Sequence, residues 1–160
     1  MTESKTFTEK EAHRLFAVQY HERTWKLLDN DARSLEDTER MIHYAQTSLA
    51  HWLEIGTPLN EQRGEWLLSR VYAVVGLADF AFHHAMRCMK LTLEHSNLMQ
   101  DYDLAFAYES MARAHALKGD QEETRKYIQL ADEAGKKIKD AGDRDYFFSD
   151  FVSGNWNGMK

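Results

Sequence analysis

Residues 105–134 contain two helical patterns joined at Gly119, and this helical hairpin most constrains what the chain can form. Ala112, Thr124 and Ala131 put small side chains where the two helices would have to approach closely. Larger apolar residues lie between them: Tyr108, Met111 and Ile128. Small and bulky side chains in alternation let two helices pack ridge into groove. The stretch therefore predicts a tightly packed helix pair.

The rest of the chain is also predicted to be helical. One proline and eight glycines in 160 residues leave long uninterrupted segments, and no alternating pattern of strand length occurs. Thr8 and Glu11 have the spacing of a capping box, which satisfies free amides at a helix start. Ser34 opens the second predicted helix. The predicted fold class is all-α, with a single domain over residues 8–152.

We expect this domain to consist of three helical hairpins and a C-terminal capping helix, with loose segments at both ends. The predicted bounds are a disordered N-terminus at 1–7, hairpins at about 8–56, 57–97 and 101–140, a cap at 143–152, and a flexible tail at 153–160. Trp156 lies on that tail, where it would dock either on its own fold or on a neighbouring chain. The sequence leaves both alternatives open.

Composition excludes several classes of protein. A formal net charge of −6 argues against general binding to nucleic acid. Cys88 is the single cysteine, which excludes an internal disulfide and fits a reducing compartment. The first residues lack the apolar core of a secretory signal, and no stretch approaches the roughly 20 apolar residues that span a bilayer. We therefore expect a cytoplasmic protein without a membrane partner.

The chain also contains a repeat with a period of 43 residues. Gly76 and Gly119 are separated by this distance, and a further step back reaches Arg33 between the first two predicted helices. Similar residues then align in three copies. They are Thr38, Ala81 and Thr124, then Ala45, Cys88 and Ala131, and for the large apolar position Trp25, Leu68 and Met111. Stacked hairpins would bury apolar faces that each hairpin alone leaves exposed.

This pattern resembles the tetratricopeptide repeat (TPR) over roughly residues 10–152, most closely in the third unit. The resemblance implies a TPR-like α-α superhelix of three helical hairpins with a capping helix. The spacing is longer than the usual length of about 34 residues in that family. The first unit also lacks the turn glycine. The alternative interpretation is an irregular helical bundle in which the period arises by chance.

In that family the first helix of each hairpin lines a concave groove that contacts ligands. By register, the groove positions here are Tyr20, Arg23, Arg63, Trp66, Arg70, Phe106, Glu109 and Arg113. Arginine pairs bidentately with carboxylates, and aromatic side chains supply contact area at low entropic cost. We therefore expect a protein or peptide partner with an acidic segment. The alternative is that these arginines form solvated ion pairs with Glu22, Glu65 and Glu109.

The family's carboxylate clamp uses lysine and asparagine at matching positions, and both are absent here, so that ligand class is not implied. A different hypothesis is a transition-metal site at His84, Cys88 and His95, which share one stripe of the fourth predicted helix. Asp101 or Asp103 could complete it. Because Cys88 already occupies a small packing position, the metal-binding hypothesis is secondary and no cofactor is predicted.

A third hypothesis is a small enzyme with a pocket for an anionic metabolite. Glycine-rich phosphate loops, nucleophile elbows and the residue pairing of thiol enzymes are all missing from the sequence. Paired carboxylates such as Asp101 and Asp103 are explained as helix caps. We therefore predict no catalytic residue. Whether the protein forms a homo-oligomer is left open.

Overall fold

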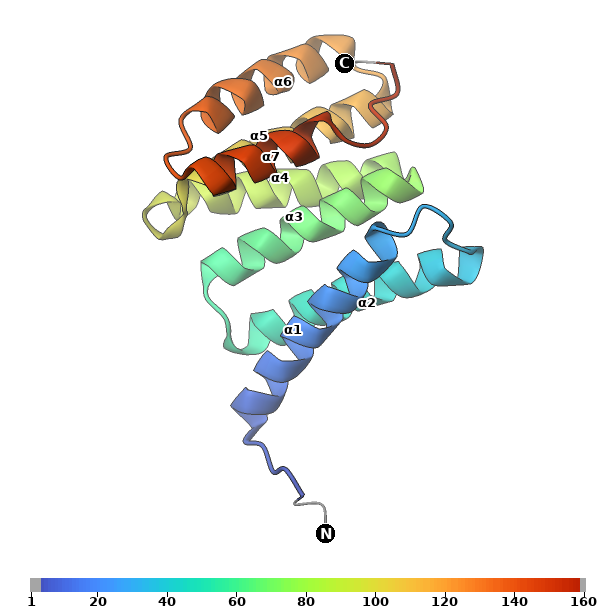
Figure 1. Cartoon of the computed structure of the whole chain (residues 1–160), viewed down its shortest axis with the longest axis vertical. Helices are drawn as coiled ribbons and strands as arrows, with labels where there is room; N and C mark the ends of the chain where they lie inside the picture. Colours follow the sequence, from blue (N-terminus) through green and yellow to red (C-terminus); the bar gives the residue numbers. More distant parts are fainter. Residues whose placement is uncertain (1–3, 159–160) are drawn as a thin grey trace.

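The computed structural model describes residues 4–158, which form seven α-helices, one short 3-10 helix and no strand (Figure 1). The helices are α1 (Glu9–Leu28), α2 (Leu35–Ile55), α3 (Pro58–Val75), α4 (Ala78–Glu94), the 3-10 helix η1 (Ser96–Leu98), α5 (Asp101–Lys118), α6 (Gln121–Lys136) and α7 (Ala141–Val152). The predicted all-α fold class is confirmed. None of these helices combines the length and the apolar composition needed to cross a bilayer.

The helices pack in consecutive hairpin-like pairs. The pairs are α1 with α2, α3 with α4, and α5 with α6, and they stack through contacts of α2 with α3 and of α4 with α5. Figure 1 shows the pairs following one another along the long axis of the molecule, with α7 lying over α5. Contacts of α3 with α5 join the first helices of the second and third pairs, and contacts of α5 with α7 add the last helix. The arrangement is consistent with an α-α superhelix.

The helix starts follow from local hydrogen bonding. The Thr8 hydroxyl accepts the Glu11 amide at 3.2 Å, and the Glu11 carboxylate accepts the Thr8 amide at 2.8 Å. Ser34 and Asp37 form the same reciprocal pair at the start of α2, at 3.0 and 3.3 Å. These bonds satisfy amides that have no partner within the helix. The capping box predicted at Thr8 is confirmed, and Ser34 opens α2 as expected.

Two of the hairpin turns depend on glycine. Gly76 ends α3 with φ +87° and Gly119 ends α5 with φ +78°, both in the left-handed region. In each turn the next residue donates its amide back into the last helical turn, from Leu77 to Tyr72 and from Asp120 to His115. A residue with a Cβ atom is disfavoured at this backbone conformation. The 43-residue spacing of these glycines therefore marks equivalent turns.

The turn between α1 and α2 has no glycine, and an arginine side chain closes it. One guanidinium nitrogen of Arg33 donates to the carbonyl oxygens of Leu27 at 2.8 Å, Leu28 at 2.9 Å and Asn30 at 2.8 Å. Two of these carbonyls belong to the last turn of α1, where they lack amide partners within the helix. A cation is also favoured at the negative end of the helix dipole. Arg33 thus stabilises the end of α1 at the register position of the two glycines.

Most of the small repeat positions form the contacts between helices. Ala81, Cys88, Thr124 and Ala131 are fully buried, whereas Thr38 is half-buried. The large repeat positions are buried or half-buried: Leu68, Met111 and Trp25. Small side chains between bulky ones allow close helix approach, as the repeat pattern predicts. The buried repeat positions agree with the stacked-hairpin interpretation.

The capping helix α7 is part of the apolar core. Phe147 is fully buried and Phe151 nearly so, in a cluster with Ala105, Ala112 and Ala131 of α5 and α6. The expected disordered N-terminus lies partly outside the described residues, and residues 4–8 precede α1 without helical structure. The start of the expected flexible tail, in contrast, is packed, because Trp156 is only 7% exposed. Of the two alternatives for Trp156, the structure shows docking on its own fold.

Candidate functional site

The first helices of the three pairs, together with α7, share one surface, which we call the inner face. A row of aromatic rings crosses it. Trp25 of α1 stacks on Trp66 of α3 at 5.9 Å between ring centroids, and Trp66 meets the edge of Phe106 of α5 at 5.2 Å. Phe106 in turn contacts Phe147 of α7 at 5.0 Å. The row connects all three hairpins and the capping helix.

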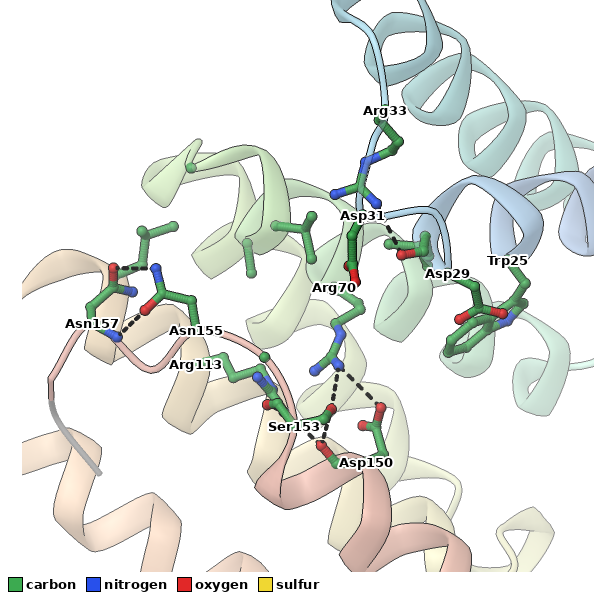
Figure 2. Close-up of a pocket in the computed structure, with 16 residues that line it drawn as sticks. Trp25, Asp29, Asp31, Arg33, Arg70, Arg113, Asp150, Ser153, Asn155 and Asn157 are labelled. Carbon is green, nitrogen blue, oxygen red and sulfur yellow. Dashed lines mark hydrogen bonds and ion pairs between the residues drawn. The ribbon is translucent and has the colours of Figure 1, made fainter.

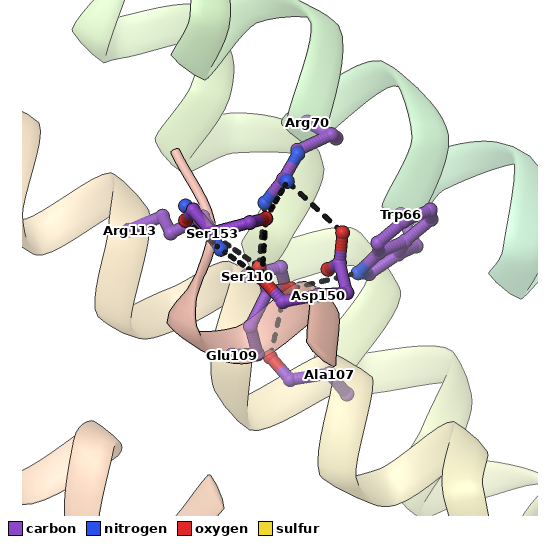
Figure 3. Close-up of polar contacts among 8 residues, drawn as sticks. All are labelled: Trp66, Arg70, Ala107, Glu109, Ser110, Arg113, Asp150 and Ser153. Atoms are coloured by element: carbon purple, nitrogen blue, oxygen red, sulfur yellow. Dashed lines mark hydrogen bonds and ion pairs between the residues drawn. The ribbon is translucent and has the colours of Figure 1, made fainter. Parts of the chain in front are cut away.

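A buried carboxylate lies at the centre of the inner face. Glu109 on α5 is 1% exposed and accepts a hydrogen bond from Arg70 at 2.9 Å and from the Trp66 indole at 3.1 Å. Arg113, one turn further along α5, also donates to the Glu109 carboxylate. Figure 3 shows these side chains converging from α3 and α5. Two arginines and an indole N–H thus share one buried acid.

The end of α7 completes this polar cluster. Asp150 accepts from the second terminal nitrogen of Arg70 at 3.0 Å. Arg113 donates to the main-chain carbonyl oxygens of Asp150 at 2.9 Å and Ser153 at 3.0 Å. The guanidinium of Arg113 also lies over the Trp156 ring, 4.3 Å from its centroid. The arginines of α3 and α5 therefore hold the C-terminal segment of their own chain.

The charges in this cluster balance, because two carboxylates face two guanidinium groups. Burial raises the pKa of Asp150, as does the nearby Glu109, while Arg70 and Arg113 oppose the shift. Burial also lowers the pKa of Arg113, an effect that Glu109 opposes and Arg70 increases. Arginine remains charged even so. A further charged ligand would have to replace one of these internal partners.

An open cavity of about 660 Å³ adjoins the cluster. It lies between the turn that follows α1, the C-terminal ends of α3 and α5, and the residues after α7 (Figure 2). Its walls include apolar side chains and three acids with three arginines. They are Trp25, Leu28, Ala73, Val74 and Leu117, then Asp29, Asp31 and Asp150, then Arg33, Arg70 and Arg113. The tail supplies Ser153, Gly154, Asn155 and Asn157.

The structure brings together five of the eight predicted groove residues. They are Trp66, Arg70, Phe106, Glu109 and Arg113. Arg63 lies nearer the start of α3, where it pairs with Asp103 at 3.0 Å and donates to the Tyr102 hydroxyl at 2.9 Å. Tyr20 and Arg23 contact each other and Tyr44 of α2, with the Arg23 guanidinium 5.0 Å from the Tyr20 ring centroid.

The alternative of internal ion pairs accounts for several of these arginines. Arg70 and Arg113 pair with Glu109, as that alternative proposed, but the acid is buried and not solvated. Glu65 does not pair with a groove arginine and instead contacts His84 and Arg87 of α4. Of the three acids in that alternative, Glu109 is the one that pairs with predicted groove arginines.

The structure gives no support to the secondary metal-binding hypothesis. Cys88 is fully buried, and burial raises the pKa of its thiol, which disfavours the thiolate that binds metals. His84 is 2.6 Å from the Glu65 carboxylate and stacks on Tyr72. Within residues 4–158, no group of three or more potential ligands is placed to hold a metal ion. His84, Cys88 and His95 do not form a site.

Of the residues that line the cavity, the predicted groove set contains only Arg70 and Arg113. Trp25 was recognised only as a packing position, although it forms one wall. Arg33 occupies the repeat position at which the other two turns have a glycine. The 43-residue spacing therefore indicates that Arg33 takes the place of a turn glycine. Asp150 and Ser153 carried no signal, because their role depends on how α7 folds back onto α3 and α5.

The comparisons with known proteins leave the site to be interpreted by its chemistry. No family model, no curated protein and no solved structure matches the chain. A fold by itself hosts many functions, so the argument for function rests on the residues of the inner face and the cavity.

Proposed function

We propose that the protein is a peptide-binding helical scaffold of TPR-like architecture whose inner face takes an acidic segment of a partner protein. One observation carries the proposal. Arg70 and Arg113 already hold a carboxylate and two main-chain carbonyls from a segment that crosses α3 and α5. These are the groups that an acidic peptide presents. The internal contacts thus supply an example of the recognition that we propose.

The cavity supplies room for such a segment. A volume of about 660 Å³ lies within the range of roughly 300–1,000 Å³ that is typical of ligand sites. Trp25 offers a large, rigid contact surface, and Arg33 brings a further guanidinium to the opposite wall. Aromatic and arginine side chains are the residues that most often dominate binding energy. The partner segment is proposed to enter between the turn after α1 and the end of α7.

A panel of labelled peptides tests the proposal by fluorescence polarisation. We expect acidic peptides to bind more tightly than neutral or basic ones of equal length. Trp25→Ala should weaken this binding by about tenfold, the loss of about 1.4 kcal/mol common for an aromatic anchor. Trp52→Ala is the matched control, because Trp52 is on α2 beneath Arg14 and outside the cavity. Equal, weak binding of all peptides would contradict the proposal.

Arg70→Lys gives a second test at the inner face. Lysine keeps the positive charge but loses the planar fork that now contacts both Glu109 and Asp150. We expect weaker binding of acidic peptides and little change for neutral ones. A thermal melt of the variant separates a binding defect from a folding defect. Unchanged affinity for acidic peptides would remove Arg70 from the proposed site.

A further inference from the structure

The residues after α7 lie on the inner face in the manner of a bound peptide. Ser153 offers its main-chain carbonyl to Arg113 at 3.0 Å and its hydroxyl to Arg70 at 3.3 Å. Trp156 is 7% exposed, stacked under the Arg113 guanidinium and edge-on to Phe151 at 5.7 Å. We call residues 153–158 the tail clip. It covers part of the surface that the proposed partner would need.

The tail clip is separable from the helix that carries it. Phe147 and Phe151 anchor α7 in the apolar core, so α7 itself is a permanent part of the fold. The tail clip begins where α7 ends, and Gly154 follows at once with φ +78°. Of residues 153–158, Trp156 is the only one classed as buried. A single aromatic anchor and a few hydrogen bonds therefore hold the segment.

The contacts of the tail clip define what could replace it. Its Trp156 ring fills the space between Arg113 and Phe151. Its Ser153 carbonyl uses one terminal N–H group of Arg113. A carboxylate makes a stronger, charge-assisted bond to that N–H than a neutral carbonyl does. A segment with both an aromatic ring and a nearby carboxylate would therefore compete favourably with the clip.

We infer that the tail clip is an internal competitor for the partner site, and that the partner segment pairs an aromatic side chain with an acidic one. The inference rests on the proposed peptide-binding function and specifies its ligand. The aromatic ring takes the place of Trp156, and the carboxylate takes the Arg113 N–H that Ser153 uses. Because the clip must leave first, the apparent affinity equals the intrinsic affinity multiplied by the fraction of molecules in which the clip is displaced.

The test uses the full chain and two synthetic peptides. The first has the sequence of residues 149–158 with aspartate in place of Ser153, SDFVDGNWNG, and the second also replaces its tryptophan with alanine. We expect the first peptide to bind Trp156→Ala protein about tenfold more tightly than wild type, since the competitor is weakened. The second peptide should bind neither protein. Val152→Ala is the matched control, because Val152 is exposed, precedes the tail clip and is not among the residues that line the cavity.

A second variant separates the release of the tail clip from a folding defect in Trp156→Ala. Gly154→Ala loosens the same segment, because an alanine is strained at positive φ and its Cβ would be 3.1 Å from Arg113 Nη1. It should also bind the first peptide more tightly than wild type. In the wild type, hydrogen exchange over residues 153–158 should quicken when the peptide saturates the protein. The double variant with Arg113→Lys and Trp156→Ala should lose the increase in affinity for the first peptide.

The possible results separate the two proposals. If acidic peptides bind in a Trp25-dependent way but Trp156→Ala and Gly154→Ala bind no better than wild type, the competitor is refuted and the scaffold stands. If no peptide binds the wild type or either variant, both proposals fail. If the wild type dimerises by exchanging tail clips, the occupant is a second copy of the chain and the inferred partner is wrong.

Discussion

Glu109 shows how a single buried residue organises the inner face. Its carboxylate receives Arg70, Arg113 and the Trp66 indole, so it joins α3 to α5. A buried acid is tolerated only where opposite charges and hydrogen-bond donors surround it. Arg70 and Arg113 depend on Glu109 in turn, because it supplies the negative charge that each guanidinium group faces. The residue is therefore structural as well as part of the proposed site.

Glu109→Gln should destabilise the fold by about 3–5 kcal/mol, the range for removing one partner of a buried charge pair. The substitution keeps the shape of the side chain but removes its charge. Arg70 then keeps its bond to the Asp150 carboxylate, whereas the buried Arg113 keeps its bonds to the main-chain carbonyls of Asp150 and Ser153. Urea unfolding measures the loss. Glu36→Gln serves as control, since its pair with Arg40 is exposed and worth about 0–1 kcal/mol. Similar small losses of stability in both variants would show that Glu109 does not act as one partner of a buried charge pair.

Glu65 predicts a pH dependence of stability. Burial raises its pKa, but hydrogen bonds from His84 and Arg87 outweigh burial, so the pKa lies below its ordinary value of 4.5. The Glu65 carboxylate therefore binds a proton more readily in the unfolded chain than in the folded protein. The stabilisation is present above pH 4.5 and is lost as the pH falls through the pKa of the folded state.

The stability difference between wild type and Glu65→Gln should accordingly shrink as the pH falls below 4.5. Thermal unfolding of both proteins at a series of pH values measures this difference. A difference that grows towards acid would mean that the folded-state pKa of Glu65 is raised and not lowered.

At the scale of helices, the sequence predicted what depends on neighbours along the chain. Thr8 and Ser34 cap their helices through residues three positions away, and Gly76 and Gly119 end theirs through a left-handed backbone. Such signals are local, so a sequence reveals them. The cap of α1 by Arg33 is also local, yet it depends on a long side chain folding back and leaves no standard pattern.

Contacts between distant helices were predicted only in part. The 43-residue register correctly placed Trp66, Arg70, Phe106, Glu109 and Arg113 on one surface. It could not show the further partners Asp150 and Ser153, because they come from α7 and the tail, which lie outside the repeat. A register fixes the direction of side chains. It does not indicate whether a later segment will cover them.

The joint between α6 and α7 allows a sharp test of packing. A Cβ atom at Gly135 would lie 2.4 Å from Cε1 of the Phe147 ring and 2.9 Å from Phe148. Gly135→Ala should therefore push α7 away and cost about 1–3 kcal/mol through overpacking. Gly142→Ala is the control, as its Cβ would meet only the side chain of Asp140, at 3.2 Å. Equal melting temperatures in the two variants would contradict the close contact.

At the scale of the whole molecule, the stacking of hairpins is nearly one-dimensional. Each pair contacts its neighbours along the axis, and α1 packs mainly against α2 at one end. At the other end, α6 packs against α5, and α7 lies over α5 and also contacts α6 (Figure 1). In such arrays stability is a sum of contributions from each unit and from each interface between units. The two ends of the molecule should therefore differ in local stability.

Hydrogen exchange in the native state tests this asymmetry. We expect the amides of α1 to exchange faster than those of α3 and α5, because α1 lacks a hairpin on its outer side while α5 is covered by α7. The measurement is mass spectrometry of peptic fragments after timed labelling. Uniform protection from α1 to α7 would mean that the protein opens only as a single cooperative unit.

The aromatic row across the inner face has an optical consequence. Trp25 and Trp66 stack at 5.9 Å, and each belongs to a different hairpin. Indole rings held so close in a fixed, chiral arrangement couple their strong electronic transitions, which produces a paired signal in far-ultraviolet circular dichroism. Any rotation of the first hairpin against the second would change that signal. The row thus provides an intrinsic reporter of any movement of α1 against α3, including one that the proposed peptide binding beside Trp25 would cause.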